Sequence, residues 1–346
     1  MAGEVKAFRT AVGRVWGGIS VVGLGDPLDV KGLTLRNRIV MPPMQTGLAT
    51  AAGAVTPDLI AHYVARARAL GLLIVEHSYV SHVGKLSDRQ VGVDDDARVE
   101  GLERLAGRVH AMGTPIVLQI NHAGRVARSA VTGLQSVAPS PTDAARGLAE
   151  TELAAVADAF AVAAERAMAA GFDGVEVHGA HGFLLNQFTS PLANQRGDSY
   201  GGSWENRIRF PLAVVKAVKA RVGGRLLLYR LGAVDLDPAG TSMEESQAFA
   251  ARLVAVGVDV IDVSGGLCGS CPAHLQGVPG FFVPYASQIK EVVEVPVIGV
   301  GGITDAAFAD RLIRDGRVDL VAVGRSLLTD AAWAVKAVAQ MQAHSR

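Results

Sequence analysis

The hydrophobic positions of this chain form short, nearly continuous runs that alternate with longer segments of helical periodicity. Runs of about four to eight apolar residues rich in Val, Ile and Leu are typical of strands buried on both faces of a parallel sheet. Eight such runs predict strands at Arg38–Met44, Gly71–Ser78, Pro115–Asn121, Phe172–His178, Arg225–Arg230, Val258–Val263, Val295–Val300 and Val318–Val323.

The segments between and after these runs carry helix signals. Their spacing predicts helices over residues 56–69, 96–112, 151–170, 205–221, 242–256, 283–293, 304–315 and 330–341. Thr56 precedes a proline that the first turn of a helix tolerates, and Ser242 with Glu245 forms a capping box. Glycines should end several helices just before the next strand, at Gly71, Gly113, Gly171, Gly257 and Gly316.

Eight repeated strand–helix units in one chain predict an α/β fold, the TIM (β/α)₈ barrel. No linker, charge run or short repeat divides the chain. We therefore expect a single barrel domain over residues 26–346, preceded by an N-terminal extension at residues 1–25. In such a barrel the active site forms at the carboxyl ends of the strands.

Composition narrows the classes of function. With 346 residues, 49% of them hydrophobic, the chain can fill one large core. Its 33 Lys and Arg balance 33 Asp and Glu, so neither a nucleic-acid face nor a polybasic membrane anchor is expected. The apolar runs are too short to span a bilayer, and the N-terminus lacks a signal-peptide pattern. Two cysteines cannot form a disulfide framework, which favours a cytoplasmic location.

Polar residues gather where the predicted strands end, although the strand interiors are almost entirely aliphatic. They are Gln45 and Thr46, Glu76 and His77, Gln119 to His122, His178 and His181, Arg230, Ser264, Gly301 and Gly302, and Gly324 and Arg325. Each residue alone is compatible with a solvated loop, but polar groups at one end of every strand indicate a site there.

Two of these groups suggest specific chemistry. The glycines after the last two strands would let backbone N–H groups approach a phosphate, and Arg325 would add a positive charge there. The alternative is that these glycines only form tight turns. His178 and His181 allow three interpretations. They could donate hydrogen bonds to a carbonyl oxygen, bind a metal ion, or be structural histidines. A third convincing ligand is missing nearby, so we expect no metal site.

Four segments resemble the old yellow enzyme family. They are residues 35–46 (LRNRIVMPPMQT), 117–125 (VLQINHAGR), 178–183 (HGAHGF) and 196–210 (RGDSYGGSWENRIRF). The likeness extends over about residues 26–330. It is strongest to the bacterial branch that includes thermophilic-type ene-reductases and the barrel domain of dienoyl-CoA reductases.

The resemblance implies a tightly but non-covalently bound FMN at the top of the barrel. The positions that match the family's flavin contacts are Pro43, Met44, Gln45, His77, Gln119 and Arg230. The positions that match its phosphate site are Gly301, Gly302, Gly324 and Arg325. Gln119 would bond the pyrimidine edge, and Arg230 would lie near N1, where negative charge develops on reduction.

The resemblance also implies a reaction. His178 and His181 match the pair that binds the carbonyl oxygen of an α,β-unsaturated substrate, so the implied enzyme is an ene-reductase that uses NAD(P)H. An enone or enal would be its partner, and relatives form dimers or tetramers. The physiological substrate and the choice between NADH and NADPH are not set by the sequence.

The sequence departs from the family pattern in the expected substrate pocket, which comprises Thr46, Phe183 and Tyr79. Phe183 stands where many members have a tyrosine that protonates the α-carbon, so another acid or solvent must supply that proton. Candidates by loop location are Tyr79, Tyr285, Cys268 and Cys271. Gln45 stands where relatives often have Cys or Thr near the flavin O4, which should change the reduction potential.

Cys268 and Cys271 form a CxxC motif after the sixth strand. It is a redox pair, half of a metal site, or a coincidence, and without a second CxxC it cannot complete a four-cysteine cluster. The dienoyl-CoA reductases carry cluster cysteines and further domains after the barrel. This chain has none before Arg346, so we expect direct reduction by NAD(P)H.

Two other functions remain open. Relatives of this barrel oxidise methylated amines, and an amine dehydrogenase or demethylase would need a cage for a cation. The aromatic residues near the predicted loops are Tyr79, Phe281, Phe282 and Tyr285. The other alternative is a flavin-binding barrel with degenerate activity.

Overall fold

The computed structural model describes residues 22–344 and confirms the predicted barrel. Its parallel strands close in the order β3-β4-β5-β8-β9-β10-β11-β12. Their bounds are β3 Ile39–Met41, β4 Leu72–Tyr79, β5 Ile116–Asn121, β8 Gly174–Gly179, β9 Leu226–Val234, β10 Val260–Gly265, β11 Val297–Gly299 and β12 Leu320–Ala322. Because all eight strands are parallel, their carboxyl ends meet on one rim.

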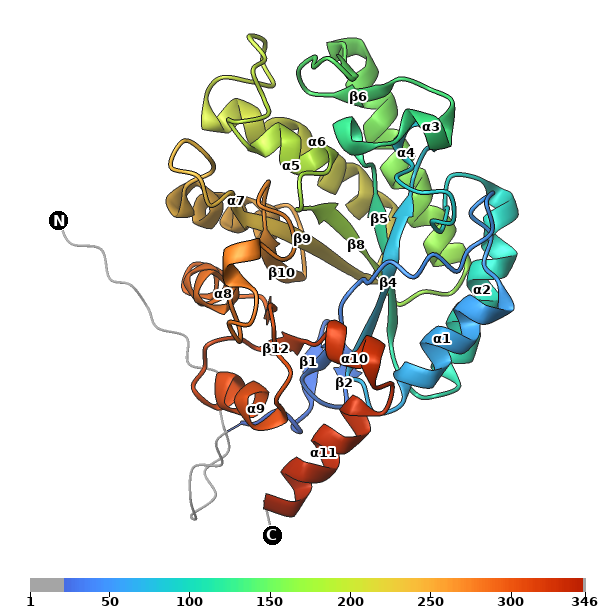
Figure 1. Cartoon of the computed structure of the whole chain (residues 1–346), viewed down its shortest axis with the longest axis vertical. Coiled ribbons are helices and arrows are strands. Elements are labelled where there is room, and N and C mark those ends of the chain that lie inside the picture. The colour runs from blue at the N-terminus through green and yellow to red at the C-terminus, as the bar shows by residue number, and fades with distance from the viewer. Residues whose placement is uncertain (1–21, 345–346) are drawn as a thin grey trace, which may run out of the picture.

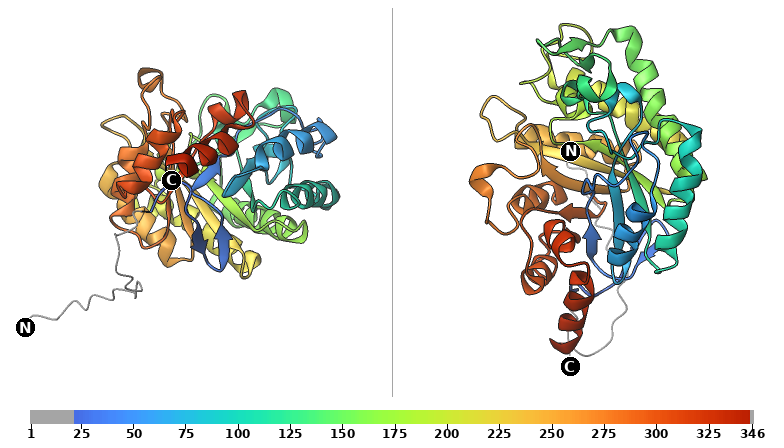
Figure 2. Two further views of the ribbon diagram at one scale, coloured as in Figure 1. Left: turned by 90° about the horizontal axis from the view of Figure 1, so that it is seen from below. Right: turned by 45° about the vertical axis from the view of Figure 1, so that its right-hand side comes forward.

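A ring of helices surrounds the strands (Figures 1 and 2). All eight predicted helices are present, with ends that differ by a few residues. They are α1 Pro57–Ala67, α2 Val99–His110, α4 Glu150–Ala169, α6 Trp204–Val222, α7 Met243–Ala255, α8 Val283–Lys290, α9 Ala306–Arg314 and α11 Trp333–His344.

Several short elements lie in the loops and were not predicted. They are α3 Ser129–Thr132, α5 Leu184–Thr189, α10 Arg325–Thr329, a pair of strands β6 Ser136–Ala138 and β7 Ala145–Gly147, and 3₁₀ turns at His82–Gly84, Asp96–Arg98, Gly124–Val126 and Ala273–Leu275. They are too short for hydrophobic periodicity to register.

The predicted helix starts are confirmed by their capping bonds. The hydroxyl of Thr56 accepts a hydrogen bond of 3.1 Å from the Leu59 N–H, and that of Ser242 accepts one of 3.2 Å from the Glu245 N–H. Such bonds satisfy backbone donors that the first turn of a helix leaves without partners.

Four of the five glycines predicted to end helices take left-handed backbone angles. The exception is Gly71, because Ala69 with φ +66° makes the turn instead. Gly71 is needed for a different reason: a Cβ there would lie 2.1 Å from the carbonyl oxygen of Asn37, which precedes β3. The glycine therefore permits close packing of two chain segments at the base of the barrel.

An N-terminal hairpin closes the bottom of the barrel. β1 (Leu28–Val30) pairs antiparallel with β2 (Leu33–Leu35), and Val30 and Leu35 join an apolar cluster inside the barrel. The other buried members of that cluster are Val40, Leu72, Ile74, Val117, Leu226, Leu228, Val260, Ile298, Leu320 and Ala322. With this end filled, the opposite rim remains for a ligand site.

The predicted N-terminal extension lies mostly outside the described residues, at 1–21. Within its described end, Leu24 is buried, and its N–H donates a hydrogen bond of 2.8 Å to the Asp310 carboxylate on α9. This short segment therefore packs against the barrel.

The first strand is shorter than predicted. It ends at Met41, because Pro42 and Pro43 have no N–H to continue the ladder of hydrogen bonds. The chain after Met41 is therefore an extended loop on the rim, and it carries Met44 and Gln45.

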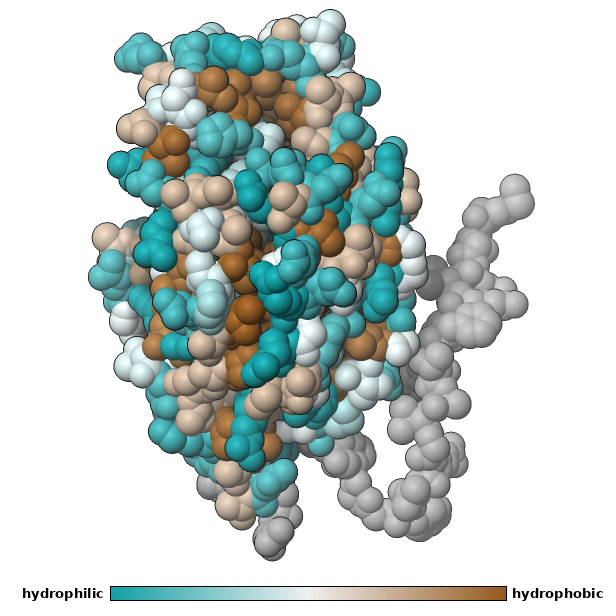
Figure 3. Space-filling view, turned by 90° about the vertical axis from the view of Figure 1, so that its right-hand side faces the viewer, coloured by the Kyte–Doolittle hydropathy of each residue, from teal (hydrophilic) through white to brown (hydrophobic). Residues whose placement is uncertain are grey.

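The outer face that holds α1 and α2 exposes apolar side chains among charged ones (Figure 3). A groove between the two helices is lined by Pro57, Ile60, Val64 and Gly107, among others. Across residues 22–344, no helix combines the length and the apolar character needed to cross a membrane.

Candidate active site

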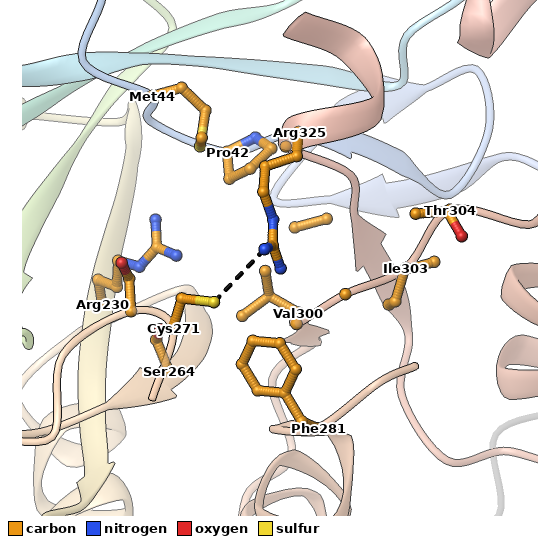
Figure 4. Close-up of a pocket in the computed structure, with 15 residues that line it drawn as sticks. Pro42, Met44, Arg230, Ser264, Cys271, Phe281, Val300, Ile303, Thr304 and Arg325 are labelled. Atoms are coloured by element: carbon orange, nitrogen blue, oxygen red, sulfur yellow. Dashed lines mark hydrogen bonds between the residues drawn. The ribbon is translucent and has the colours of Figure 1, made fainter. Parts of the chain in front are cut away.

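A cavity opens on the carboxyl rim of the barrel (Figure 4). About 670 Å³ of it is not filled by protein atoms, with the open solvent at its mouth included. Its wall is formed by Pro42, Met44, Arg230, Ser264, Ser270, Cys271, Phe281, Val300, Gly301, Gly302, Ile303, Thr304, Ala322, Gly324 and Arg325.

Most residues predicted to contact a cofactor lie on this wall. They are Met44, Arg230, Gly301, Gly302, Gly324 and Arg325. Pro42 lines the cavity where the sequence suggested Pro43. The apolar wall residues Val300, Ile303 and Ala322 were not anticipated, because aliphatic residues at the end of a strand resemble the strand itself.

One end of the cavity has the character of an anion site. Gly301 has φ +116°, and a Cβ there would lie 2.8 Å from the Phe281 ring, so only glycine fits this turn. A glycine turn lets backbone N–H groups approach an anion closely. Arg325 reaches the same region, where its Nη1 lies 3.4 Å from the Cys271 sulfur (Figure 4).

A group of buried polar side chains adjoins the cavity through Arg230. Gln119 is 1% exposed, and its Nε2 donates a hydrogen bond of 2.7 Å to Glu176 Oε1. Among the described residues, Gln119 Oε1 has no hydrogen-bond partner. Arg230 is 4% exposed and lies on the cavity wall, with its Nε 3.5 Å from Asp262 Oδ2. Arg230 therefore presents a cation to the cavity, and the buried group that it belongs to holds a free acceptor on Gln119.

The imidazoles of His77 and His178 contact Phe183, and a third imidazole, that of His181, adjoins His178. The ring centroids of His178 and His181 are 5.0 Å apart, in an edge-on arrangement. The Phe183 ring lies 4.8 Å from the His178 ring and 5.5 Å from the His77 ring. Residues from the ends of β4 and β8 thus meet in one cluster.

Hydrogen bonds from the protein fix two of these rings. The Ala180 N–H donates to His178 Nδ1 at 3.3 Å, and Gln90 Nε2 donates to His77 Nδ1 at 2.8 Å. A neutral imidazole that accepts at Nδ1 carries its proton on Nε2. Both rings can therefore donate a hydrogen bond from Nε2.

His181 is held differently, at the turn after β8. Its φ is +58°, an unusual value for a residue with a side chain, and its N–H donates a hydrogen bond of 3.0 Å to the Gly265 carbonyl. Its ring Nε2 lies 2.8 Å from Ser264 Oγ. A strained backbone held by the next strands is common at functional sites.

The environment keeps all three imidazoles neutral. Burial lowers the pKa of His77 to about 4, and the charge of Arg230 adds to the effect. Burial also lowers the pKa values of His178 and His181 well below the ordinary histidine range, with the neighbouring imidazole and Arg230 as further causes for His178. At neutral pH the cluster thus offers uncharged N–H donors.

The structure places three other candidates away from this cluster. The Gln45 amide donates to the Ser87 hydroxyl, and Thr46 Oγ1 donates at 2.5 Å to Glu76 Oε1. Tyr79 is buried, with its hydroxyl donating at 2.9 Å to the Ala52 carbonyl. The register of β4 shifts between Val75 and Ser78, so successive side chains there do not simply alternate between the two faces of the strand.

The sequence did not assign roles to Gln90, Glu176 and Asp262. Glu176 and Asp262 are charged residues inside otherwise apolar strands, which is a signal for buried polar interactions. Gln90 lies in a loop, and nothing in the local pattern links it to His77. Only the folded chain brings these two residues together.

The two cysteines show no metal-binding arrangement. Both thiols are free, and over residues 22–344 no group of three or more His, Cys, Asp or Glu side chains could hold a metal ion. Burial and the nearby Asp235 raise the pKa of the Cys268 thiol to about 11, so this thiol is mostly protonated at neutral pH.

Residues 24–344 match the sequence profile of the NADH:flavin oxidoreductase / NADH oxidase family. The chain belongs to this family. It is 38% identical over 327 residues to an NADPH dehydrogenase of Bacillus licheniformis, with 92% of this chain and 94% of the relative covered. It is 44% identical over 321 residues to an NADH oxidase of Thermoanaerobacter brockii, which covers 89% of this chain. The chain spans about half, 49%, of that longer relative.

Solved structures place the chain within the old yellow enzymes of this family. The old yellow enzyme homologue from Zymomonas mobilis superposes with a TM-score of 0.78 at 29% identity, covering 89% of this chain and 90% of its own. Morphinone reductase superposes with a TM-score of 0.81 at 29% identity, covering 93% and 90%. The chain is therefore an NAD(P)H-dependent flavin oxidoreductase of old yellow enzyme type that uses non-covalent FMN.

The cavity fits the donor and acceptor pattern of FMN. The unpaired Gln119 Oε1 can accept from the N3–H of the isoalloxazine ring, and Arg230 can face its N1 and C2 carbonyl region. The Gly301 turn and Arg325 suit the terminal phosphate. These residues would hold the cofactor on the rim.

Proposed function

We propose that this flavin oxidoreductase is an ene-reductase, which uses NAD(P)H to reduce activated C=C bonds of α,β-unsaturated carbonyl compounds. The observation that carries the proposal is the pair of neutral, buried imidazoles of His178 and His181, with ring centroids 5.0 Å apart beside the cavity. A neutral N–H pair suits an uncharged carbonyl oxygen that becomes more negative as the reaction proceeds.

The chain's own groups perform the polarisation step. Bound FMN supplies hydride transfer, from the nicotinamide to the cofactor and then to the alkene. His178 donates from Nε2 to the substrate oxygen, because its Nδ1 is occupied by the Ala180 N–H. Drawing electron density to that oxygen makes the β-carbon electrophilic. The proposed activity therefore needs no charged acid at the carbonyl.

The α-carbon must receive its proton from another source than Phe183. Cys271 lines the cavity, but its sulfur lies 3.4 Å from Arg325 Nη1, at the end that suits a phosphate. The other suggested donors are engaged elsewhere: Tyr79 bonds to Ala52, and the Cys268 sulfur donates at 3.2 Å to the Val234 carbonyl. Tyr285 packs near Phe282, at a ring distance of 6.4 Å. We propose that solvent entering the cavity supplies this proton.

Steady-state oxidation of NADPH with 2-cyclohexenone tests the proposal. We expect turnover that falls at least tenfold in H178A and in H181A, while both variants keep bound FMN and its rate of reduction by NADPH. A wild-type enzyme that oxidises NADPH with oxygen but leaves cyclohexenone unreduced would reject the proposal.

An amine dehydrogenase is the alternative within this family, and the site does not favour it. Arg230 places a positive charge on the cavity wall, and Phe281 is packed against Gly301 instead of forming a cage. Trimethylamine with a dye acceptor provides the comparison assay. A degenerate flavin-binding barrel would be inactive in both assays.

The remaining expectations concern the setting of the enzyme. We propose a cytoplasmic enzyme that acts on small enones or enals and assembles as a dimer or tetramer. Light scattering of the purified holoenzyme tests its assembly state, and a mass equal to one chain would contradict that part.

A further inference from the structure

Four buried polar side chains lie on neighbouring strands inside the barrel, and one of them, Arg230, lines the cavity. They come from consecutive barrel strands: Gln119 on β5, Glu176 on β8, Arg230 on β9 and Asp262 on β10. Register pairs Gln119 with Glu176 and Arg230 with Asp262. Their exposures are 1%, 0%, 4% and 0%, and the apolar cluster of the closed barrel end lies below them. Charges in such a place require partners.

Two pairs of these side chains are in contact, but only the first pair is joined by a hydrogen bond. Gln119 Nε2 donates at 2.7 Å to Glu176 Oε1, and Arg230 Nε lies 3.5 Å from Asp262 Oδ2. Glu176 Oε2, Arg230 Nε and both oxygens of Asp262 have no hydrogen-bond partner among the described residues. Two ionised carboxylates beside one arginine would also leave a net negative charge in the barrel.

A single proton between the two carboxyls would pair Glu176 Oε2 with an Asp262 oxygen and would remove the net negative charge. If Glu176 is a neutral carboxylic acid, its Oε2–H can donate to the Asp262 carboxylate, while its Oε1 still accepts from Gln119. The order of donation then runs from Gln119 to Glu176 to Asp262, and Asp262 balances the charge of Arg230. Buried carboxylic acids adjacent to an anion are known to keep their protons.

The electrostatics of the two carboxyls point the same way. Burial raises the pKa of Glu176 well above its ordinary range, and the charge of Asp262 raises it further. Burial also raises the pKa of Asp262, but Arg230 and a hydrogen bond with Glu176 oppose that rise. The shared proton therefore resides on Glu176.

We propose that Glu176, as a neutral acid, and Asp262, as an anion, are positioning residues that set the reduction potential of the bound FMN. Glu176 holds the Gln119 amide with Nε2 turned inward, which leaves Oε1 as the acceptor for the cofactor. Asp262 Oδ2 lies 3.5 Å from Arg230 Nε, so the Asp262 carboxylate offsets part of the positive charge of Arg230. Asp262 thereby limits how strongly Arg230 stabilises the negative charge of the reduced cofactor.

This inference rests on the cofactor of the family and not on the proposed alkene substrate. Its tests use no alkene, so a failed cyclohexenone assay would leave them unaffected. The two decisive variants are Glu176→Gln and Asp262→Asn, in the holoenzyme. The glutamine amide reproduces the neutral acid, because it accepts from Gln119 and donates to Asp262, whereas the asparagine removes the anion.

The first measurement is the equilibrium of FMN reduction against a reference dye. We expect E176Q to lie within about twofold of wild type. D262N should favour reduction by on the order of tenfold, from Coulomb's law at an effective dielectric constant of about 20. A merely structural role would not separate the two variants in this way. If E176Q favours reduction as strongly as D262N, both carboxyls are ionised and the proposal is wrong.

The second measurement is the infrared carbonyl band of a protonated carboxyl, which shifts in D₂O. We expect this band in the wild-type holoenzyme and its loss in E176Q. Persistence of the band in E176Q would place the proton elsewhere and overturn the assignment. If D262N does not retain FMN, the E176Q equilibrium and the infrared band still decide between the outcomes.

Discussion

The ring Nε2 of His181 lies 2.8 Å from Ser264 Oγ, so the second imidazole of the proposed substrate pair is already held by a partner at the end of the next-but-one strand. Ser264 is 1% exposed and also lines the cavity. The orientation of His181 is therefore set by barrel closure together with its own turn. We therefore propose that Ser264 positions His181 within the carbonyl-binding site that we infer.

Replacing Ser264 tests this positioning role. S264A removes the partner of His181, and we expect the Kd for phenol to rise about fivefold, which corresponds to about 1 kcal/mol for one neutral hydrogen bond. S264T keeps the hydroxyl and should bind phenol like wild type. The charge-transfer absorbance of the phenol complex measures both affinities. Equal affinity in S264A and wild type would mean that the turn alone orients His181.

Phe183 offers a gain-of-function test. Its ring lies between His77 and His178, so a hydroxyl in F183Y would reach a place where a proton donor can serve the bound substrate. General acid catalysis commonly contributes about 10²–10⁴-fold, and we expect the rate of enone reduction to rise at least tenfold. F183L is the control without a hydroxyl. Rapid mixing of reduced enzyme with cyclohexenone reports the rate, and no gain in F183Y would show that protonation is not limiting.

Gly301 and Gly277 form a matched pair for testing the phosphate end. Both have positive φ, +116° and +82°, so alanine strains the backbone at either site. At Gly301 the Cβ would also collide with Phe281, whereas at Gly277 it meets nothing within 4 Å. We expect G301A to weaken FMN binding at least tenfold and G277A to retain it, as measured by flavin fluorescence on release. Similar losses in both would indicate a general effect of strain.

Stability should depend on pH through buried histidines. Burial lowers the pKa values of His77 and His122 from 6.5 to about 4, so between these values the unfolded chain binds more protons than the folded one. The free energy of unfolding should thus be highest above about pH 6.5 and fall toward about pH 4. The loss is up to about 1.4 kcal/mol per pH unit for each histidine.

His122→Asn isolates one of these contributions. Asparagine offers an acceptor for the Gly124 N–H, which donates at 3.0 Å to His122 Nδ1, but it takes up no proton. Urea unfolding of the holoenzyme at several pH values should show a shallower decline for H122N than for wild type. Parallel curves would contradict the assignment of a buried, neutral His122.

Much of the fold could be read from local patterns. The eight strands follow from apolar runs, and the helix starts at Thr56 and Ser242 follow from capping chemistry within a few residues. The glycines at Gly113 and Gly171 do take the left-handed angles that helix ends favour. These features depend on neighbours in the chain, so the sequence alone suffices to predict them.

Parts of the site could not be predicted in this way. Tyr79 is the last residue of β4 and lies two residues after His77, yet its hydroxyl bonds to Ala52, and the register of β4 shifts between Val75 and Ser78. Likewise, Pro42 lines the cavity and Pro43 does not, which depends on how the loop leaves β3. A shift of one residue in a strand reverses the direction of a side chain.

By itself, the sequence determined that the chain forms a barrel with polar residues at its strand ends, because periodicity, caps and turns act over short distances. Only the tertiary structure decided which of these residues meet. The contacts of Gln90 with His77, Ser264 with His181, and Glu176 with Gln119 join separate strands and loops. Their hydrogen bonds, burial and protonation states arise only when the barrel closes, since each depends on groups far away in the chain.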